Sequence, residues 1–147
     1  MFRSIVVGTD GSETAHRAVE AAVELARLTG ATLELVSAYE PVSNQRLRRE
    51  ARQVPPDLQW MVNPREDVDA TLAVAAERVR GAGVTAEVYA REGDPADAIL
   101  DVAEELGSEL IVIGNKGMTG AKRFLLGSVP NKVSHHAPCA VMIIRTS

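Results

Sequence analysis

Short apolar runs alternate with longer segments of helical period along this chain, and this alternation constrains the fold more than any other feature. The runs at 5–7 and 110–113 are too short for helices and are typical of strands buried on both faces. Between such runs apolar residues recur at helical spacing, as Val19, Ala22 and Ala26 do. Strands that alternate with helices predict an α/β fold with a parallel sheet and helices on both faces.

Glycine, proline and capping residues set the expected boundaries of the elements. Strands are expected at 5–7, 31–39, 84–89, 110–113 and 140–144. Helices are expected from the 10–12 turn to residue 30, and over 65–80, 94–107 and 128–136. Either Asp10 or Ser12 is suited to cap the first helix. Residues 40–64 hold four prolines and a cluster of arginines, which predicts a long loop that is either a solvated face or a lid.

Length and composition exclude several classes of protein. The 147 residues suit one domain, expected over 1–147. Hydrophobic residues make up 46% of the chain and aromatics 3%, so the core is expected to consist of aliphatic side chains. A net charge of −4 excludes a broad basic face, so no nucleic acid is expected as a partner. No apolar stretch reaches about 18 residues, so no membrane is expected, and the start lacks a signal peptide, which favours the cytoplasm. The single cysteine, Cys139, excludes an intrachain disulfide.

A glycine-rich segment follows the fourth expected strand and leads into the last expected helix. Gly114 and Gly117 allow several backbone N–H groups to turn toward one point, which forms a cradle for an anion. Gly127 and Ser128 stand at the helix start, where free N–H groups and the helix dipole favour a phosphate. Lys116 lies in the same segment, within reach of such a group. The segment predicts an anion site, although the same glycines also suit a simple turn.

The turn after the first strand, Thr9-Asp10-Gly11-Ser12, carries the second set of candidates. In open parallel sheets, ligands bind beyond the carboxyl ends of the strands, where the strand order reverses. This turn and the glycine segment face one crevice if the first and fourth strands are neighbours, which the residues alone leave open. Asp10 is either a ligand contact or a helix cap, and the two roles are compatible.

The spacing Gly114-x2-Gly117-x9-Gly127-Ser128, joined to the segment 7–12, resembles the universal stress protein family. Segments 125–129 and 137–144 resemble that family as well, so the likeness covers nearly the whole chain outside 40–64. It implies a three-layer sandwich around a five-stranded parallel sheet of order 3-2-1-4-5. It also implies a homodimer formed through the last strand.

The resemblance implies an adenine nucleotide as ligand, because members with this glycine pattern bind ATP. ATP, with or without Mg²⁺, is the first expectation, and cyclic AMP, which a subset of members binds, is the second. Thr9, Ala38 and Ile113 are implied beside the adenine, and Asp10 near the ribose or a metal-bridged phosphate. Phosphates and ribose are implied to contact Gly114, Gly117, Gly127, Ser128 and Val129. Gly8 replaces the proline of some ATP-binding members, which predicts a looser adenine wall.

Four functions stay open at this point. The favoured one is a regulatory stress-response protein that binds ATP. The others are a cyclic AMP-binding protein, a slow ATPase in which Asp10 positions a metal or water, and a nucleotide-free dimeric interaction module. The chain has neither a Gly-x-x-x-x-Gly-Lys-Ser/Thr loop nor a nucleophile elbow, so no catalytic residue and no metal ligand is expected.

Overall fold

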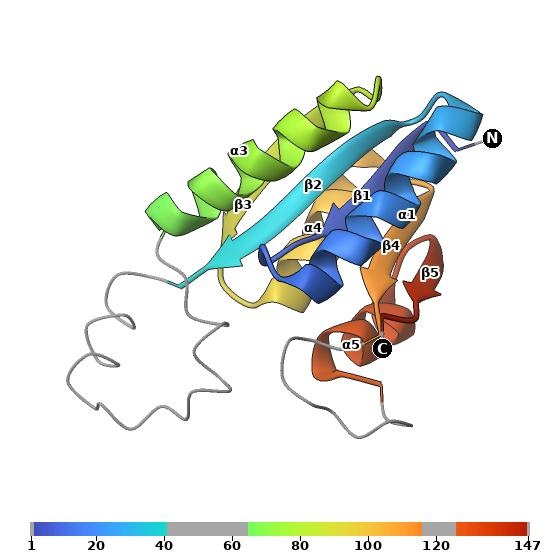
Figure 1. Ribbon diagram of the computed structural model, residues 1–147. Coiled ribbons are helices and arrows are strands. Elements are labelled where there is room, and N and C mark those ends of the chain that lie inside the picture. The colour runs from blue at the N-terminus through green and yellow to red at the C-terminus, as the bar shows by residue number, and fades with distance from the viewer. Residues whose placement is uncertain (1, 41–64, 116–125, 147) are drawn as a thin grey trace.

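The computed structural model describes residues 2–40, 65–115 and 126–146, in which five parallel strands form one sheet (Figure 1). The strands are β1 (Ser4–Gly8), β2 (Thr32–Tyr39), β3 (Ala86–Glu92), β4 (Leu110–Gly114) and β5 (Ala140–Ile144). Their order is β3-β2-β1-β4-β5, with every neighbouring pair parallel, which confirms the order that the family resemblance implied. β1 and β4 are therefore side by side.

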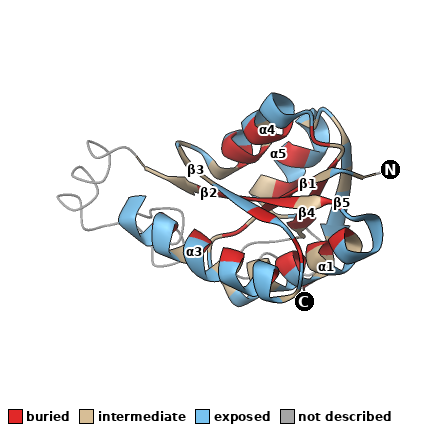
Figure 2. Ribbon diagram, turned by 90° about the horizontal axis from the view of Figure 1, so that it is seen from above, coloured by how far each residue is buried: buried red, intermediate tan, exposed pale blue. Residues whose placement is uncertain are grey.

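Helices cover both faces of the sheet and complete the three layers. They are α1 (Glu13–Thr29), α3 (Arg65–Gly81), α4 (Pro95–Leu106) and α5 (Ser128–His136). Figure 2 shows α1 and α3 on one side of the sheet and α4 and α5 on the other. None of these helices is both long and apolar enough to cross a lipid bilayer.

Two apolar cores lie on the two faces of the sheet, as the alternation of side chains along each strand requires. Ile5 and Val7 of β1 pack with α1 and α3, whereas Val6 packs with α4 and α5. β1 and β4 are buried along their middle residues, as their apolar runs predicted. β5 is different, because it lies at the sheet edge and leaves Met142 and Ile143 more than a third exposed.

The element boundaries follow local chemistry. Ser12 caps α1 by accepting a hydrogen bond from the amide of Ala15 at 3.1 Å, which resolves the choice between Asp10 and Ser12. Gly30, in the left-handed region, ends α1 as expected. β3 begins and ends later than the predicted 84–89, because its pairing with β2 runs from Ala86 to Glu92. Charged residues at an edge strand hid this extension from the apolar pattern.

Candidate functional site

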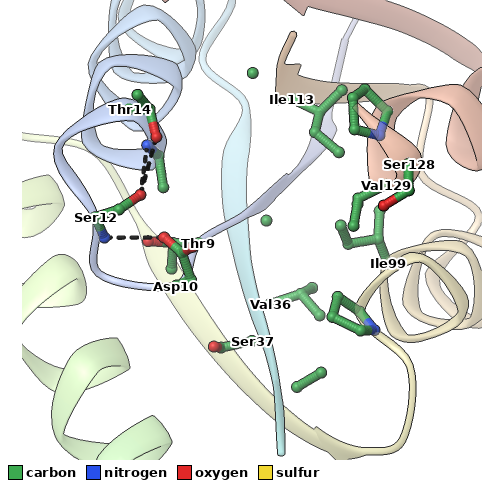
Figure 3. A pocket seen from close by; sticks show the side chains of 16 residues that line it. Thr9, Asp10, Ser12, Thr14, Val36, Ser37, Ile99, Ile113, Ser128 and Val129 are labelled. Atoms are coloured by element: carbon green, nitrogen blue, oxygen red, sulfur yellow. Dashed lines mark hydrogen bonds between the residues drawn. The ribbon is translucent and has the colours of Figure 1, made fainter. Parts of the chain in front are cut away.

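A pocket lies at the carboxyl ends of β1, β2 and β4, next to the starts of α1, α4 and α5 (Figure 3). Its empty volume is about 800 Å³, including space open to solvent. The lining residues are Gly8, Thr9, Asp10, Ser12, Thr14, Ala15, Val36, Ser37, Ala38, Pro95, Ile99, Ile113, Gly114, Ser128, Val129 and Pro130. The strand order reverses beside β1, so the pocket stands where open parallel sheets bind ligands.

The β1–α1 turn supplies a polar side of the pocket and is held by its own hydrogen bonds. Asp10 Oδ1 accepts from the amide of Ser12 at 2.9 Å, and Thr9 Oγ1 accepts from the amide of Gly11 at 3.2 Å. Ser12 Oγ lies 3.1 Å from Thr14 Oγ1, and the amide of Thr9 donates to the carbonyl of Val36 at 2.9 Å. These bonds hold a carboxylate and several hydroxyls in one place beside the pocket.

The opposite side of the pocket is mainly apolar. Figure 3 shows Ile99, Ile113 and Val129 facing the polar turn across the cavity, with Val36 from β2 between them. Ile99 and Ile113 are at most 6% exposed and belong to the core on the α4 side of the sheet. A mostly apolar pocket with a few placed polar groups is typical of sites for flat organic ligands.

Gly8, at the end of β1, closely approaches Ile99 of α4. A Cβ atom at this position would lie 2.5 Å from Ile99 Cδ1 and 3.2 Å from Ile99 Cγ1. The space that a larger residue at position 8 would fill is therefore occupied by Ile99 of α4. The side chain that fills this space comes from a helix 91 residues further along, from position 8 to position 99, and the looser adenine wall stays a prediction.

The start of α5 opens into the pocket without a side-chain cap. Its cap residue is Gly127, which has an extended backbone and no side chain to offer, and Ser128 and Val129 both line the cavity. The first N–H groups of any helix lack intrahelical partners, and a proline at position 130 has none to give. The amides of Ser128 and Val129 are therefore the donors that this helix offers to an anion.

Asn115 joins the pocket to the end of the chain, and the sequence patterns missed it. Its carbonyl accepts from the amide of Gly127 at 2.9 Å, and its own amide donates to Ile144 at 2.9 Å. Its Oδ1 accepts from the amide and the hydroxyl of Thr146 at 2.9 and 3.0 Å. Thr146 lies 31 residues away from Asn115, so no local pattern indicated this contact. Asn115 thus positions the start of α5.

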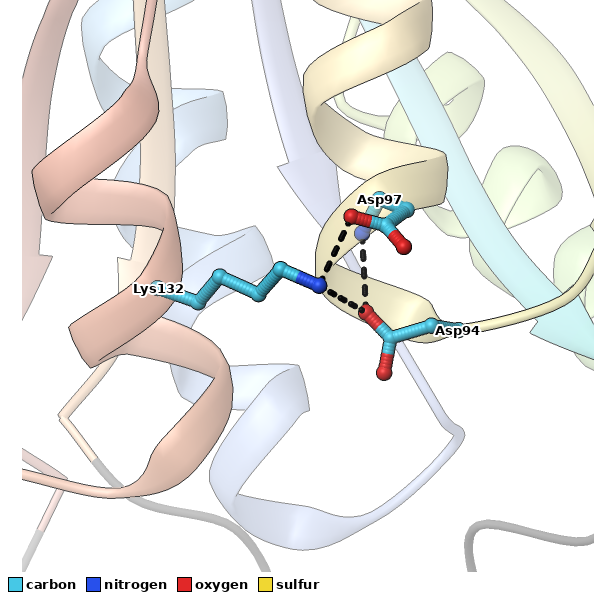
Figure 4. A network of polar contacts seen from close by, with 3 residues as sticks. All are labelled: Asp94, Asp97 and Lys132. Atoms are coloured by element: carbon cyan, nitrogen blue, oxygen red, sulfur yellow. Dashed lines mark hydrogen bonds and ion pairs between the residues drawn. The ribbon is translucent and has the colours of Figure 1, made fainter.

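The charges around the pocket are unevenly placed. Asp10 is the one ionisable side chain among the lining residues of the described chain, and none of those residues is a lysine or arginine. Outside the lining, Lys132 of α5 pairs with Asp97 at 2.8 Å and Asp94 at 3.4 Å at the start of α4 (Figure 4). The hydrogen bond to Asp97 raises the pKa of Lys132. No group of three or more metal-ligating side chains occurs within 2–40, 65–115 and 126–146.

Comparison with known proteins agrees with this geometry. The family model described as "Universal stress protein family" matches residues 1–145. The chain belongs to the universal stress protein family. Universal stress protein Rv1636 of Mycobacterium tuberculosis is 35% identical over 147 residues, covering 99% of this chain and 98% of the relative.

Two solved universal stress proteins are similar in structure and were determined with nucleotides. One is a universal stress protein in complex with cAMP, with a TM-score of 0.72, 32% identity, and coverage of 99% of this chain and 98% of that one. The other is the universal stress protein from Archaeoglobus fulgidus in complex with dAMP, with a TM-score of 0.69 and 28% identity. The match covers 97% of this chain and 98% of the Archaeoglobus fulgidus chain.

Most of the residues implied by the universal stress protein resemblance meet around the pocket. Those that line it are Gly8, Thr9, Asp10, Ala38, Ile113, Gly114, Ser128 and Val129. Gly127 does not line it, because its amide is directed to Asn115 instead. Lys116 and Gly117 lie outside the described residues, as does the arginine cluster of the 40–64 segment. The roles of all these residues toward a ligand stay predictions.

Further lining residues of this universal stress protein had not been predicted as site residues. They are Ser12, Thr14, Ala15, Val36, Ser37, Pro95, Ile99 and Pro130. Ser12 ends the predicted turn, and Thr14 and Ala15 follow it in α1, so the adjacency of the first and fourth strands would have been enough to find them. Pro95 and Ile99 lie within the helix expected over 94–107, and no local pattern there indicates contact with the cavity.

Proposed function

We propose that this chain binds an adenine nucleotide in the pocket and acts as a regulatory stress-response protein. One observation carries the proposal: the uncapped start of α5 and the polar β1–α1 turn flank one cavity with an apolar side. That arrangement offers donors to a phosphate, hydroxyls and a carboxylate to a ribose, and an apolar surface to a purine. Universal stress proteins of known structure hold cAMP or dAMP, which supports the same ligand class here.

The phosphate is assigned to the amides of Ser128 and Val129 and the Ser128 hydroxyl. Each hydrogen bond to a charged group contributes about 1.5–3 kcal/mol. Three such bonds and the burial of one purine, less the cost of association, match the roughly 8 kcal/mol of a micromolar site. The base is assigned to the apolar side, with Ala38 and Ile113, and the ribose to Asp10.

ATP and cyclic AMP are the two candidates within this class. ATP follows from the glycine pattern, of which Gly117 lies outside the described part, as does the neighbouring Lys116. Cyclic AMP is favoured by a specific observation, because no lysine or arginine occurs among the described lining residues. A single phosphate charge is matched by amides and hydroxyls, whereas a triphosphate normally needs a cation or metal.

Mass spectrometry under native conditions tests the proposal without choosing a ligand in advance. The protein is purified at low salt and the mass of any retained small molecule is measured. We expect an adenine nucleotide at one per chain. A calorimetric competition then separates the candidates, because cyclic AMP and ATP should displace each other from one site. A chain that retains nothing and gives no heat with either nucleotide would refute the proposal.

Hydrolysis is the alternative use of the same site. Asp10 is the carboxylate beside the pocket, and its Oδ1 already accepts from Ser12, which leaves Oδ2 to position a metal or water. Sustained phosphate release that Asp10→Asn abolishes would support a slow ATPase. Phosphate release at the background rate, with nucleotide still bound, is what we expect of a regulatory protein.

We also propose a homodimer through β5. This strand is an edge of the sheet, and its neighbouring residues Met142 and Ile143 are 37% and 39% exposed. Unpaired edges that carry apolar residues readily pair with another strand. Analytical ultracentrifugation should show a dimer for the wild type and a monomer for Ile143→Lys. A wild-type monomer at high concentration would contradict this.

A further inference from the structure

We infer that Ile99 sets the depth of the pocket and thereby selects which purine rings enter it. The inference rests on the proposed function, since it concerns the base part of the nucleotide site. Its basis is a contact between two elements far apart in the sequence: Gly8 at the end of β1 and Ile99 in the second turn of α4.

A larger residue at position 8 requires the end of the Ile99 side chain to move. A Cβ atom at position 8 would lie 2.5 Å from Ile99 Cδ1, which is shorter than the contacts that Cβ atoms make in proteins. Gly8 is not in the left-handed region, so its lack of a side chain serves this close approach rather than an unusual backbone. The glycine therefore provides the slot in which the Ile99 side chain rests.

The surroundings of Ile99 determine where it would go if that slot were filled. Val6 and Ile111 belong to the same cluster as Ile99, are fully buried, and do not line the pocket. Close-packed interiors resist the insertion of even one methyl group. The pocket is the neighbouring free volume, since Ile99 lines it directly. A Cβ at position 8 thus displaces Ile99 into the space assigned to the base.

The converse follows from the same packing. Truncation of Ile99 extends the cavity toward α4 without altering the polar turn or the start of α5. The pocket then accepts a ring that carries an additional substituent, and it holds the unsubstituted ring less well. Residues 8 and 99 act as a pair whose combined size sets the depth.

The test measures affinities for ATP, N6-benzyl-ATP and 2-methylthio-ATP by calorimetry. Wild type, Ile99→Ala, Ile99→Val and Gly8→Ala are compared, with Val102→Ala as matched control. Val102 lies on the same helix and is fully buried in the same cluster, but it does not line the pocket. Ile99→Val keeps the fold if the alanine variant proves too unstable.

We expect Ile99→Ala to shift the ratio of analogue to ATP affinity by about tenfold or more toward at least one analogue, with a smaller shift for Ile99→Val. Gly8→Ala should weaken ATP binding by a similar factor, and Ile99→Ala in the same chain should restore part of it. Val102→Ala should leave the ratios unchanged. Without any ligand, Gly8→Ala should lower Tm. The Tm of the variant that combines Gly8→Ala with Ile99→Ala should be higher than the sum of the two single decreases predicts.

Two results would overturn the inference. If wild type binds ATP while both Ile99 variants keep the wild-type affinity ratios, Ile99 does not set the depth and the proposed function stands. If the wild type binds no adenine nucleotide, the proposed function fails together with the inference.

Discussion

The starts of α4 and α5 lie beside the same pocket but are built in opposite ways. Asp94 closes α4, because its Oδ2 accepts from the amide of Asp97 at 3.0 Å and Pro95 follows at the first position. Gly127 leaves α5 open, with no side-chain cap. Lys132 bridges the two starts through its ion pairs with both aspartates (Figure 4). The comparison indicates that a helix start can bind an anion only where no side chain of the protein already accepts hydrogen bonds from its free N–H groups.

Closing the α5 start should have the largest effect on function. Gly127→Asp places a capping carboxylate at an extended backbone position, where it competes with the phosphate and repels it. We expect nucleotide affinity to fall by about tenfold or more, measured by calorimetry, because charge-assisted hydrogen bonds contribute about 1.5–3 kcal/mol each.

Stability should change much less in that variant, since aspartate and glycine caps differ by a few tenths of a kcal/mol. Gly127→Asn is the matched control, because asparagine caps equally well without the charge. Equal affinities in wild type and both variants would show that the α5 amides do not hold the ligand.

Opening the α4 start should affect stability instead of binding. Asp94→Ala removes the cap and should lower the free energy of unfolding by about 1 kcal/mol, seen as a lower denaturant midpoint. Nucleotide affinity should stay within about twofold. A strong loss of affinity with unchanged stability would contradict the assigned division of roles between the two helix starts.

Glu34 provides a further comparison, because it is a polar group of the same sheet face that lies away from the pocket. It is 7% exposed, and its Oε2 has no hydrogen-bond partner. Burial raises the pKa of Glu34 above its ordinary value of 4.5, a hydrogen bond with Tyr89 opposes the shift, and the charge of Glu87 adds to it. The folded state therefore favours the protonated carboxyl.

The pH dependence follows from this direction. Below pH 4.5 Glu34 is protonated in both states and costs nothing; as pH rises through 4.5 and then through the higher pKa of the folded state, stability is lost. Glu34→Gln should therefore be more stable than wild type at neutral pH, by about 1 kcal/mol. The difference should shrink toward pH 4 in denaturant melts. A difference that is constant with pH would show that Glu34 does not titrate this way.

Substitution of Lys132, whose ion pairs connect α5 to the start of α4, should have the smallest effect on stability. Lys132 and its partners are about half exposed, and such pairs contribute little. Lys132→Met should lower Tm slightly at low salt and not at about 1 M salt, where surface charges are screened. Persistence of the difference at high salt would indicate packing by the lysine stem instead.

The features that could be predicted from the sequence are those set by neighbouring residues, such as helix ends and buried strands. Asp94 followed by Pro95, and the glycine at 107 with a φ of 62°, marked both ends of α4, and the apolar run of β4 marked a buried strand. The strand order came from family resemblance, because residue patterns do not state which strands are neighbours. Contacts between distant segments were missed for the same reason, as the entry of Ile99 into the Gly8 slot and the bonds of Asn115 to Thr146 show.

A calorimetric titration with ATP and with cyclic AMP tests the central claim most directly, using wild type, Ala38→Leu and Glu34→Gln. Ala38 lines the pocket, so leucine fills part of it, whereas Glu34 lies outside the lining. We predict one site per chain with a Kd near the micromolar range for at least one nucleotide, lost in Ala38→Leu and kept in Glu34→Gln. No heat from the wild type, or equally tight binding by Ala38→Leu, would contradict the claim that this pocket holds the nucleotide.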